Sequence, residues 1–163
     1  MPLKNNLIVK NNLIAIAIHI CICLVFFIPV GYIWWWGDVW FDLVWDWGLM
    51  SVIFNWLAIG IFTIVSLFLY LGLGRKFLCR TNNMKTNIFS VIVLVIILAV
   101  AVLIAYDSNI WQPLLKLPFY PLGETISYFL QIKKQFVFLI LSFLPSLMML
   151  AGMMTKRKEN HLP

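Results

Sequence analysis

Four long apolar blocks, separated by polar stretches, set the pattern of this chain. They lie at about residues 13–36, 49–73, 88–106 and 135–154, and none of them contains Asp, Glu, Lys or Arg. A helix rises about 1.5 Å per residue, so about 20 residues cross a hydrocarbon core of about 30 Å. The pattern therefore predicts an all-α integral membrane protein, folded as a single bundle of four transmembrane helices.

The second block is the one with a polar stripe. At 100° per residue its polar side chains fall within about a third of the helix circumference, and they are Ser51, Asn55, Thr63, Ser66 and Tyr70. Such groups hydrogen-bond across membrane helices, so the stripe is expected to face the bundle, with Asn55 as the costliest group to leave in lipid. Gly72 and Gly74 are expected to open a turn after this helix.

Residues 34–48, which comprise the end of the first block and the connection to the second, hold six of the eight tryptophans. A tryptophan ring is stable at headgroup depth, where its apolar part lies in hydrocarbon and its N–H remains hydrated. The stretch therefore predicts an aromatic belt that marks where two membrane helices end.

Three acids in the same stretch, Asp38, Asp42 and Asp46, are spaced four residues apart. In a helix this spacing places them in one stripe. We expect a short interfacial helix between hinges at Gly37 and Gly48, with its acids toward water. Together with Trp40 and Trp45, the acids form a candidate contact surface on the outer face. The alternatives are a plain solvated face, which is the commoner use of such a run, and a cation site.

The connection at residues 107–134 is the longest between two blocks. Pro113, Pro118 and Pro121 prevent a continuous helix in its first half. After Gly123 the pattern becomes helical, and it is compatible with one helix that runs unbroken into the fourth block. We expect this segment to lie on the membrane because it is rich in aromatic and aliphatic residues.

The charged residues divide unequally between the two sides of the predicted bundle. The side with both termini and residues 75–87 has nine Lys or Arg and one acid, whereas the opposite side has three Lys and five acids. Short loops rich in Lys and Arg stay in the cytoplasm. Both termini are therefore expected inside and the tryptophan stretch outside, in a multi-pass protein of the cell membrane, and the plentiful Ile, Asn and Lys suggest a bacterial inner or plasma membrane.

Composition excludes further classes of protein. The chain has 163 residues, of which 63% are hydrophobic and 11% charged, a balance that no soluble domain of this length requires. The net charge of +6 does not indicate nucleic acid, because the basic residues lie beside the ends of the blocks. The three cysteines provide no disulfide framework, since none lies in a predicted outer loop.

His19 is the most suggestive residue for chemistry. His19 and Cys23 share a helix face, but two ligands do not make a closed metal site, and no cofactor or metal is expected. Because His19 lies at a depth similar to Ser66 and Ser146, we expect a neutral imidazole hydrogen-bonded to one of those hydroxyls. With Asn55, these residues form the predicted intramembrane polar cluster. A proton-linked or ligand-binding role for His19 is the alternative.

No catalytic set is present in the sequence. It lacks the converging carboxylates of four-span lipoprotein peptidases and the paired outer cysteines of quinone-linked disulfide oxidoreductases. We therefore expect no enzyme but a protein that acts by protein–protein contact in the lipid bilayer, with another membrane protein or with itself. The expected roles are an accessory subunit of a membrane complex or an immunity-type protective protein.

The plan of short tails and four spans is similar to that of bacterial immunity proteins against pore-forming toxins, although no motif carries this similarity. The alternative function is a small oligomeric transporter or channel that uses the polar stripe of the second block and His19.

Overall fold

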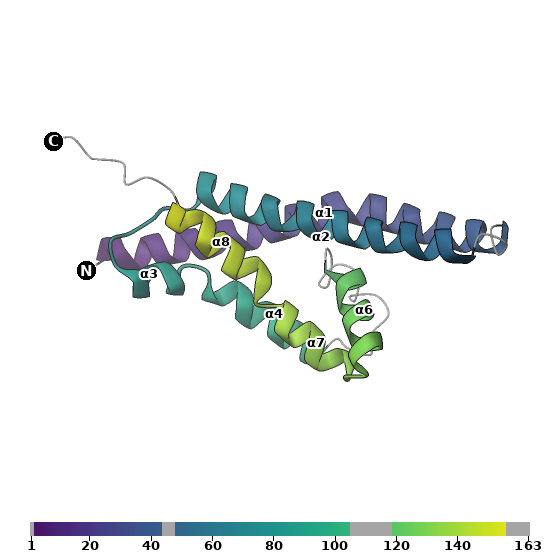
Figure 1. Ribbon diagram of the computed structural model, residues 1–163. Coiled ribbons are helices and arrows are strands. Elements are labelled where there is room, and N and C mark those ends of the chain that lie inside the picture. The colour runs from purple at the N-terminus through teal and green to yellow at the C-terminus, as the bar shows by residue number, and fades with distance from the viewer. Residues whose placement is uncertain (1, 44–47, 105–118, 156–163) are drawn as a thin grey trace.

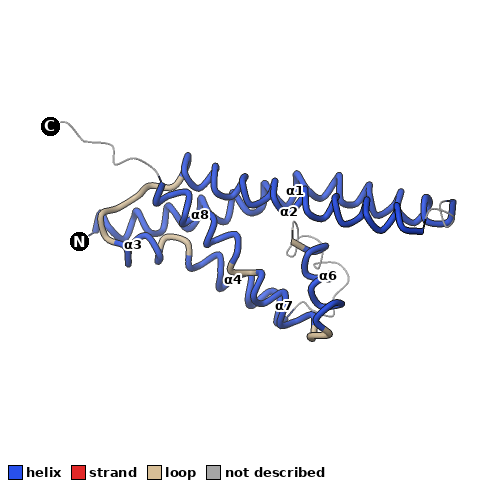
Figure 2. Tube along the Cα trace, viewed as in Figure 1, coloured by secondary structure: helices blue, strands red, loops and turns tan. Residues whose placement is uncertain are grey.

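The computed structural model describes the backbone of residues 2–43, 48–104 and 119–155, without the side chains of residues 2–5, 27–43, 48–56, 58–59, 120–121 and 124–125. These residues are helical or in short turns, and none of them forms a strand (Figure 2). The helices are α1 Pro2–Leu43, α2 Gly48–Phe77, α3 Met84–Phe89, α4 Ile92–Ile104, α6 Tyr120–Leu130, α7 Lys134–Leu141 and α8 Leu144–Thr155.

Among the described residues, four segments are long and apolar enough to cross a membrane, which agrees with the predicted number. They are Asn6–Phe26, Gly60–Phe77, Met84–Ile104 and Lys134–Thr155. The third combines α3 with α4, and the fourth combines α7 with α8. The fourth segment is interrupted close to Pro145, because a proline lacks the N–H that would continue the helical ladder.

Helix α1 differs most from the sequence-based expectation. It is one helix of 42 residues, so the expected hinge at Gly37 is wrong and residues 37–43 continue α1. A single glycine costs a helix only about 1 kcal/mol, which is too little to end it by itself. Gly48 does mark a boundary, since α2 begins there.

At about 1.5 Å per residue, α1 is about 63 Å long, twice a hydrocarbon core of about 30 Å. Helices α1 and α2 run side by side in opposite directions, and both continue well beyond the ends of α4 and α7 (Figure 1). The two helices thus form a long hairpin whose far end carries the tryptophan stretch.

Helix α6 does not continue into the fourth span. It begins at Tyr120, with a proline in its first turn, and its C-cap residue Gln131 adopts a left-handed conformation with φ of 52°. A left-handed residue is a common way to end a helix. The chain then reverses into α7, and α6 lies in the opening between the α1–α2 hairpin and α7 (Figure 1). A Cβ atom on Gly123 would lie 2.6 Å from Cζ of Phe138, so the glycine permits close packing of α6 on α7.

Helix α8 packs most extensively against α2, and two glycines permit the close approach. A Cβ atom on Gly74 would lie 2.6 Å from the carbonyl oxygen of Met149, and one on Gly152 would overlap the carbonyl oxygen of Leu71. Small residues at such crossings are typical of membrane helices. The expected turn at Gly72 and Gly74 is therefore wrong, since α2 continues to Phe77.

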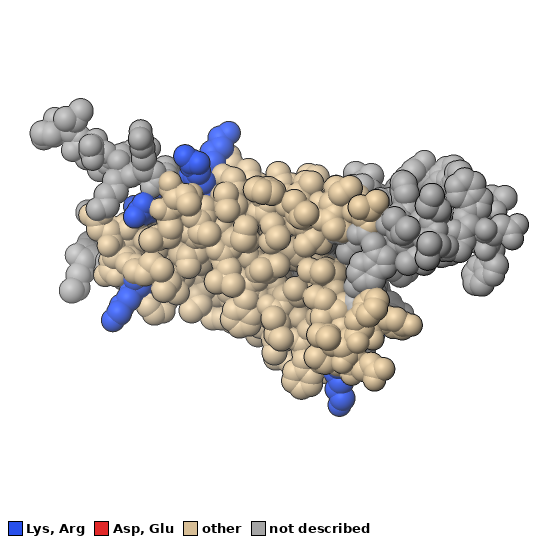
Figure 3. Space-filling model, viewed as in Figure 1, with Lys and Arg blue, Asp and Glu red and all other residues tan. Residues whose placement is uncertain are grey.

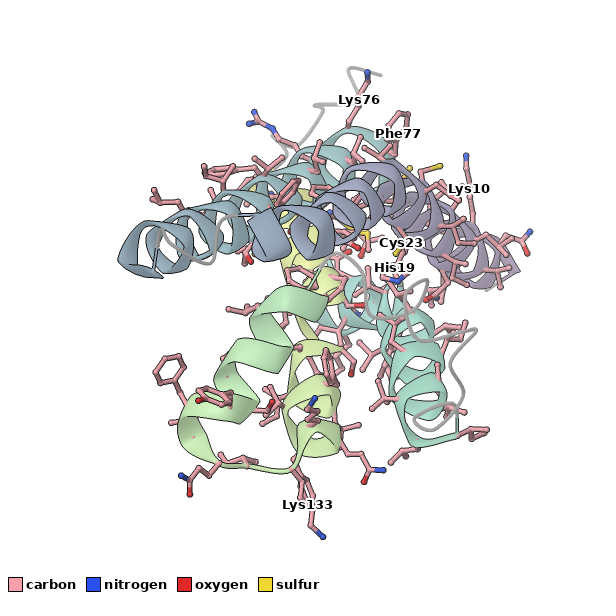
Figure 4. The ribbon with its side chains drawn as sticks, turned by 90° about the vertical axis from the view of Figure 1, so that its right-hand side faces the viewer. Lys10, His19, Cys23, Lys76, Phe77 and Lys133 are labelled. Atoms are coloured by element: carbon pink, nitrogen blue, oxygen red, sulfur yellow. The ribbon has the colours of Figure 1, made fainter. Side chains whose placement is uncertain are left out.

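The start of α1 and the end of α8 lie at the same end of the bundle, which we call the terminal end (Figure 1). Most of the described Lys and Arg side chains gather around this end, which is the left side of Figure 3. Lys133 lies at the opposite end, at the turn between α6 and α7 (Figure 4). Among the described residues, the basic side chains are thus divided unequally between the two ends.

Candidate functional site

His19 lies in the interior of the bundle, where its side chain is 5% exposed. Its Nδ1 atom shares a hydrogen bond of 2.7 Å with the hydroxyl of Tyr70, and the tautomer of the imidazole decides which of the two donates. The two rings are stacked, with centroids 5.9 Å apart. Tyr70 is fully buried, so this contact joins α1 to α2 away from water.

Cys23 lies one helical turn after His19, and its Sγ atom is 3.5 Å from Nε2 of the histidine. Both side chains point into the bundle from α1 (Figure 4), whereas Cys21 is exposed, as the spacing predicts. Both ring nitrogens of His19 are therefore engaged. Among the described residues, no three His, Cys, Asp or Glu side chains are grouped closely enough to hold a metal ion.

Phe119 completes a stack of three rings. Its ring lies 6.0 Å from that of Tyr70, nearly parallel to it, and the side chain is 3% exposed. Phe119 directly precedes α6, so the stack of His19, Tyr70 and Phe119 joins α1, α2 and the start of α6. We call these three residues the ring stack.

His19 bonds to Tyr70 of the ring stack, and not to one of the serines that the sequence predicted as its partner. Ser66 is buried but donates to the carbonyl of Thr63 in its own helix, at 2.8 Å. Ser146 is also buried, and its Oγ atom has no hydrogen-bond partner. The predicted bond from His19 to Ser66 or Ser146 is therefore wrong, while the side chain of Asn55 lies outside the described residues. Serine easily bonds a carbonyl of its own helix because its side chain is short. The longer side chain of tyrosine reaches a neighbouring helix.

A second polar site lies near the end of the bundle that holds the termini. Asn11 of α1 is fully buried, and its amide makes two bonds to the backbone of Cys79. Nδ2 of Asn11 donates to the carbonyl of Cys79 at 2.9 Å, and the N–H of Cys79 donates to Oδ1 at 3.1 Å. One side chain thus satisfies both backbone groups of a residue just after α2.

Asn12 makes the same kind of contact at the break between α3 and α4. Its Nδ2 atom donates to the carbonyl of Phe89 at 2.8 Å, and its Oδ1 atom accepts from the N–H of Val93 at 3.2 Å. The carbonyl and N–H groups at a helix break lack partners within the helices. Asn12 supplies partners for two of them from a neighbouring helix.

Asn87 organises the loop before α3 in a similar way. Its Oδ1 atom accepts from both the N–H and the hydroxyl of Thr81, and its Nδ2 atom donates to the carbonyl of Thr81 at 3.0 Å. Arg80 in the same loop donates to the carbonyl of Met154 near the end of α8, at 2.7 Å. We call Asn11, Asn12 and Asn87 the asparagine clamp.

The asparagine clamp was not predicted, because residues 1–12 precede the first apolar block and have a polar composition. However, α1 begins at Pro2, and the second Asn-Asn pair is inside the fold. The available signal was the position of that pair, which directly precedes the first apolar block on the same predicted side as the polar residues 75–87. Phe119 gave no comparable signal.

The predicted contact surface on the outer face lies at the tip of the α1–α2 hairpin. Asp38, Trp40 and Asp42 belong to the last turns of α1, and their side chains lie outside the described residues. Trp45 and Asp46 lie in residues 44–47, which the structure does not describe. The helical backbone keeps Asp38 and Asp42 on one face, four residues apart.

Comparison with known protein families, with curated proteins and with solved structures finds no match for this chain. Its function is therefore argued from its own residues.

Proposed function

We propose that this chain is an integral membrane protein with four spans that acts by protein–protein contact, as an accessory subunit of a membrane complex or an immunity-type protective protein. In this proposal it resides in a cell membrane, most simply the inner or plasma membrane of a bacterium, with both termini in the cytoplasm. The four apolar segments and the basic residues at the terminal end support this placement.

One observation carries the non-catalytic part of the proposal: the described polar groups in the bundle are used by the fold itself. Both nitrogens of His19 are engaged, and Ser66 and Ser142 bond carbonyls of their own helices. Catalysis or transport needs polar groups that face a substrate. Among the described buried oxygen and nitrogen atoms of side chains, only Oγ of Ser146 has no partner.

The tip of the α1–α2 hairpin is the proposed contact surface. The hairpin extends beyond α4 and α7, so in the proposed orientation its far end lies toward the outer side (Figure 1). Asp38 and Asp42 lie on this extension, and Asp46 follows in the connection. Acids next to tryptophans suit a partner with basic and apolar groups, because tryptophans often dominate binding energy at interfaces.

The channel or transporter alternative has less support. It relied on His19 and on the polar stripe of α2, but Ser66 and Tyr70 of that stripe face the interior and are hydrogen-bonded there. A pore would therefore require several copies and a rearrangement of these contacts.

The test is a pull-down of the tagged chain from membranes of its native host, in mild detergent. The variant Asp38→Asn/Asp42→Asn is compared with Asp107→Asn/Glu124→Gln, which removes the same charge from the predicted outer side but outside the hairpin. We expect a stoichiometric partner that the hairpin variant releases and the control retains. A chain that purifies without a partner, or a partner that both variants retain, would contradict the proposal.

A further inference from the structure

The described basic side chains at the terminal end come from several segments of the chain. Lys10 lies on α1, Arg75 and Lys76 on the last turn of α2, and Lys85 on α3, and all four are exposed. Figure 3 shows the Lys and Arg side chains around this end of the molecule, and Lys10 and Lys76 point away from the bundle in Figure 4. We call these four residues the basic collar.

The asparagine clamp holds the segments of the basic collar in place. Asn11, next to Lys10, binds the backbone of Cys79, three residues after Lys76. Asn83 caps α3 by accepting a hydrogen bond from the backbone N–H of Lys85 at 3.0 Å. The cations are therefore carried by a structured loop and helix ends, which reduces the entropy lost when they bind a ligand.

Exposed apolar side chains lie among these cations. They are Phe77, Met84, Ile88 and Phe89, which are 41–54% exposed. The Nζ atom of Lys76 lies 5.4 Å from the centroid of the Phe77 ring. A surface that mixes cations with exposed aromatic and aliphatic groups suits the boundary between headgroups and acyl chains, where the rings enter hydrocarbon and the amines reach phosphates.

The charge of the basic collar is not balanced by acids in the described part of this end. The one acid that the sequence assigns to this side of the bundle is Glu159, which lies in the C-terminal segment outside the described residues. Clusters of four or more Lys and Arg beside membrane helices attract anionic lipids.

We propose that the basic collar binds the headgroups of anionic phospholipids in the surrounding bilayer. Lys76 and Lys85 contact lipid phosphates, while Phe77 and Phe89 pack against the upper acyl chains. The inference concerns the end of the molecule opposite to the hairpin tip, so it is independent of the proposed protein contact. It also does not depend on which leaflet that end occupies.

The experiment measures which lipids surround the purified full-length chain in phosphatidylcholine bilayers. Electron paramagnetic resonance of spin-labelled phosphatidylglycerol and spin-labelled phosphatidylcholine gives the ratio of their association constants. The variant Lys76→Gln/Lys85→Gln is compared with Lys133→Gln/Lys134→Gln, which removes the same charge at the opposite end.

We expect the unmodified chain to associate more strongly with phosphatidylglycerol than with phosphatidylcholine. In the collar variant the ratio of the two association constants should fall by up to about fivefold for each cation removed. The control variant should keep the preference. An equal loss in both variants, or no preference in the unmodified chain, would overturn the proposal.

Two further arms use the unmodified chain and do not depend on a variant. Raising the sodium chloride concentration should weaken the preference, because salt screens exposed charges. Inorganic phosphate at matched ionic strength should weaken it no more than chloride does. Stronger displacement by phosphate would mean that the basic collar binds free phosphate, and would overturn the assignment to lipid.

Discussion

The ring stack and the asparagine clamp both join α1 to the rest of the bundle, but they do so with different groups. In the ring stack, one hydrogen bond connects the side chains of His19 and Tyr70. In the asparagine clamp, each side chain bonds to backbone groups of another segment, and Asn11 and Asn12 each make two such bonds. The middle of the bundle thus relies on side-chain packing, and the terminal end relies on backbone pairing.

The difference follows from where the helices are broken. In mid-bundle α1 and α2 are continuous, so their backbone groups are satisfied within each helix. At the terminal end the chain turns between α2 and α3 and breaks again between α3 and α4. Unpaired backbone groups are costly in or near hydrocarbon, which makes the asparagine clamp the more important of the two regions for stability.

Substitution of Gly152 should have the largest effect on stability. Gly152 lies on α8, two residues before Met154, whose carbonyl accepts a hydrogen bond from Arg80. In Gly152→Val the side chain would overlap the carbonyl oxygen of Leu71, so α8 would have to move away from α2. We expect a loss of about 3 kcal/mol or more in the free energy of unfolding, as for other overpacked sites. Unfolding by sodium dodecyl sulfate in mixed micelles measures it.

Gly72 provides the matched control for this substitution. A Cβ atom on Gly72 would meet nothing within 4 Å, so Gly72→Ala should be tolerated and even gain up to about 1 kcal/mol from better helix propensity. If Gly72→Ala and Gly152→Val destabilise equally, glycine is needed for flexibility of the helices and not for close packing.

Asn11→Ala should have the next largest effect. It removes two hydrogen bonds from the backbone of Cys79 at a fully buried position. Leaving buried backbone groups unpaired costs about 1–3 kcal/mol, and we expect about 2 kcal/mol in the same unfolding assay. Asn6→Ala is the control, since Asn6 is exposed on the same helix and should change stability by less than about 0.5 kcal/mol.

Tyr70→Phe should cost less than Asn11→Ala. It removes the hydroxyl bonded to His19 but keeps the ring against Phe119, so we expect about 1 kcal/mol. A double-mutant cycle of Tyr70→Phe with His19→Ala should give a coupling of about 0.6 kcal/mol, the average between membrane helices, and no more than about 1.7 kcal/mol, the maximum. A coupling near zero would mean that the two side chains stack without a useful hydrogen bond.

His19→Gln tests whether the imidazole acts by hydrogen bonding or by titration. Glutamine keeps donor and acceptor groups but cannot carry a proton at neutral pH. We expect His19→Gln to retain stability better than His19→Ala, and to retain partner binding in the pull-down. Loss of binding in a stable His19→Gln variant would instead support a proton-linked role.

The four spans could be predicted because apolar blocks without charges have few alternatives to crossing a membrane. The boundaries were less predictable. Composition favours a hinge at Gly37, yet α1 continues to Leu43. The helical ladder tolerates a single glycine, and a partner helix can compensate for its low propensity. Composition alone does not reveal such a partner.

The candidate sites were predictable only in part. The face shared by His19 and Cys23 follows from helical spacing, and Tyr70 was already on the stripe expected to face the bundle. The partner of His19 was not predictable, because similar depth along two helices says nothing about side-chain reach. The position of Asn11 and Asn12 directly before an apolar block was a signal that they could lie inside the fold. Their particular partners were not predictable, because these partners are backbone groups, which any residue type provides.

Ser146→Ala should have the smallest effect, and it separates the two accounts of His19. If Ser146 bonded the imidazole, its loss would cost about 1 kcal/mol. In the structure Ser146 is 2% exposed and its hydroxyl has no partner, so alanine should leave stability unchanged or raise it by up to about 1 kcal/mol. Ser66→Ala is the control, since it removes only a bond within its own helix. If Ser146→Ala lowers stability and Ser66→Ala does not, Ser146 is the hydrogen-bond partner of His19, and the assignment to Tyr70 is wrong.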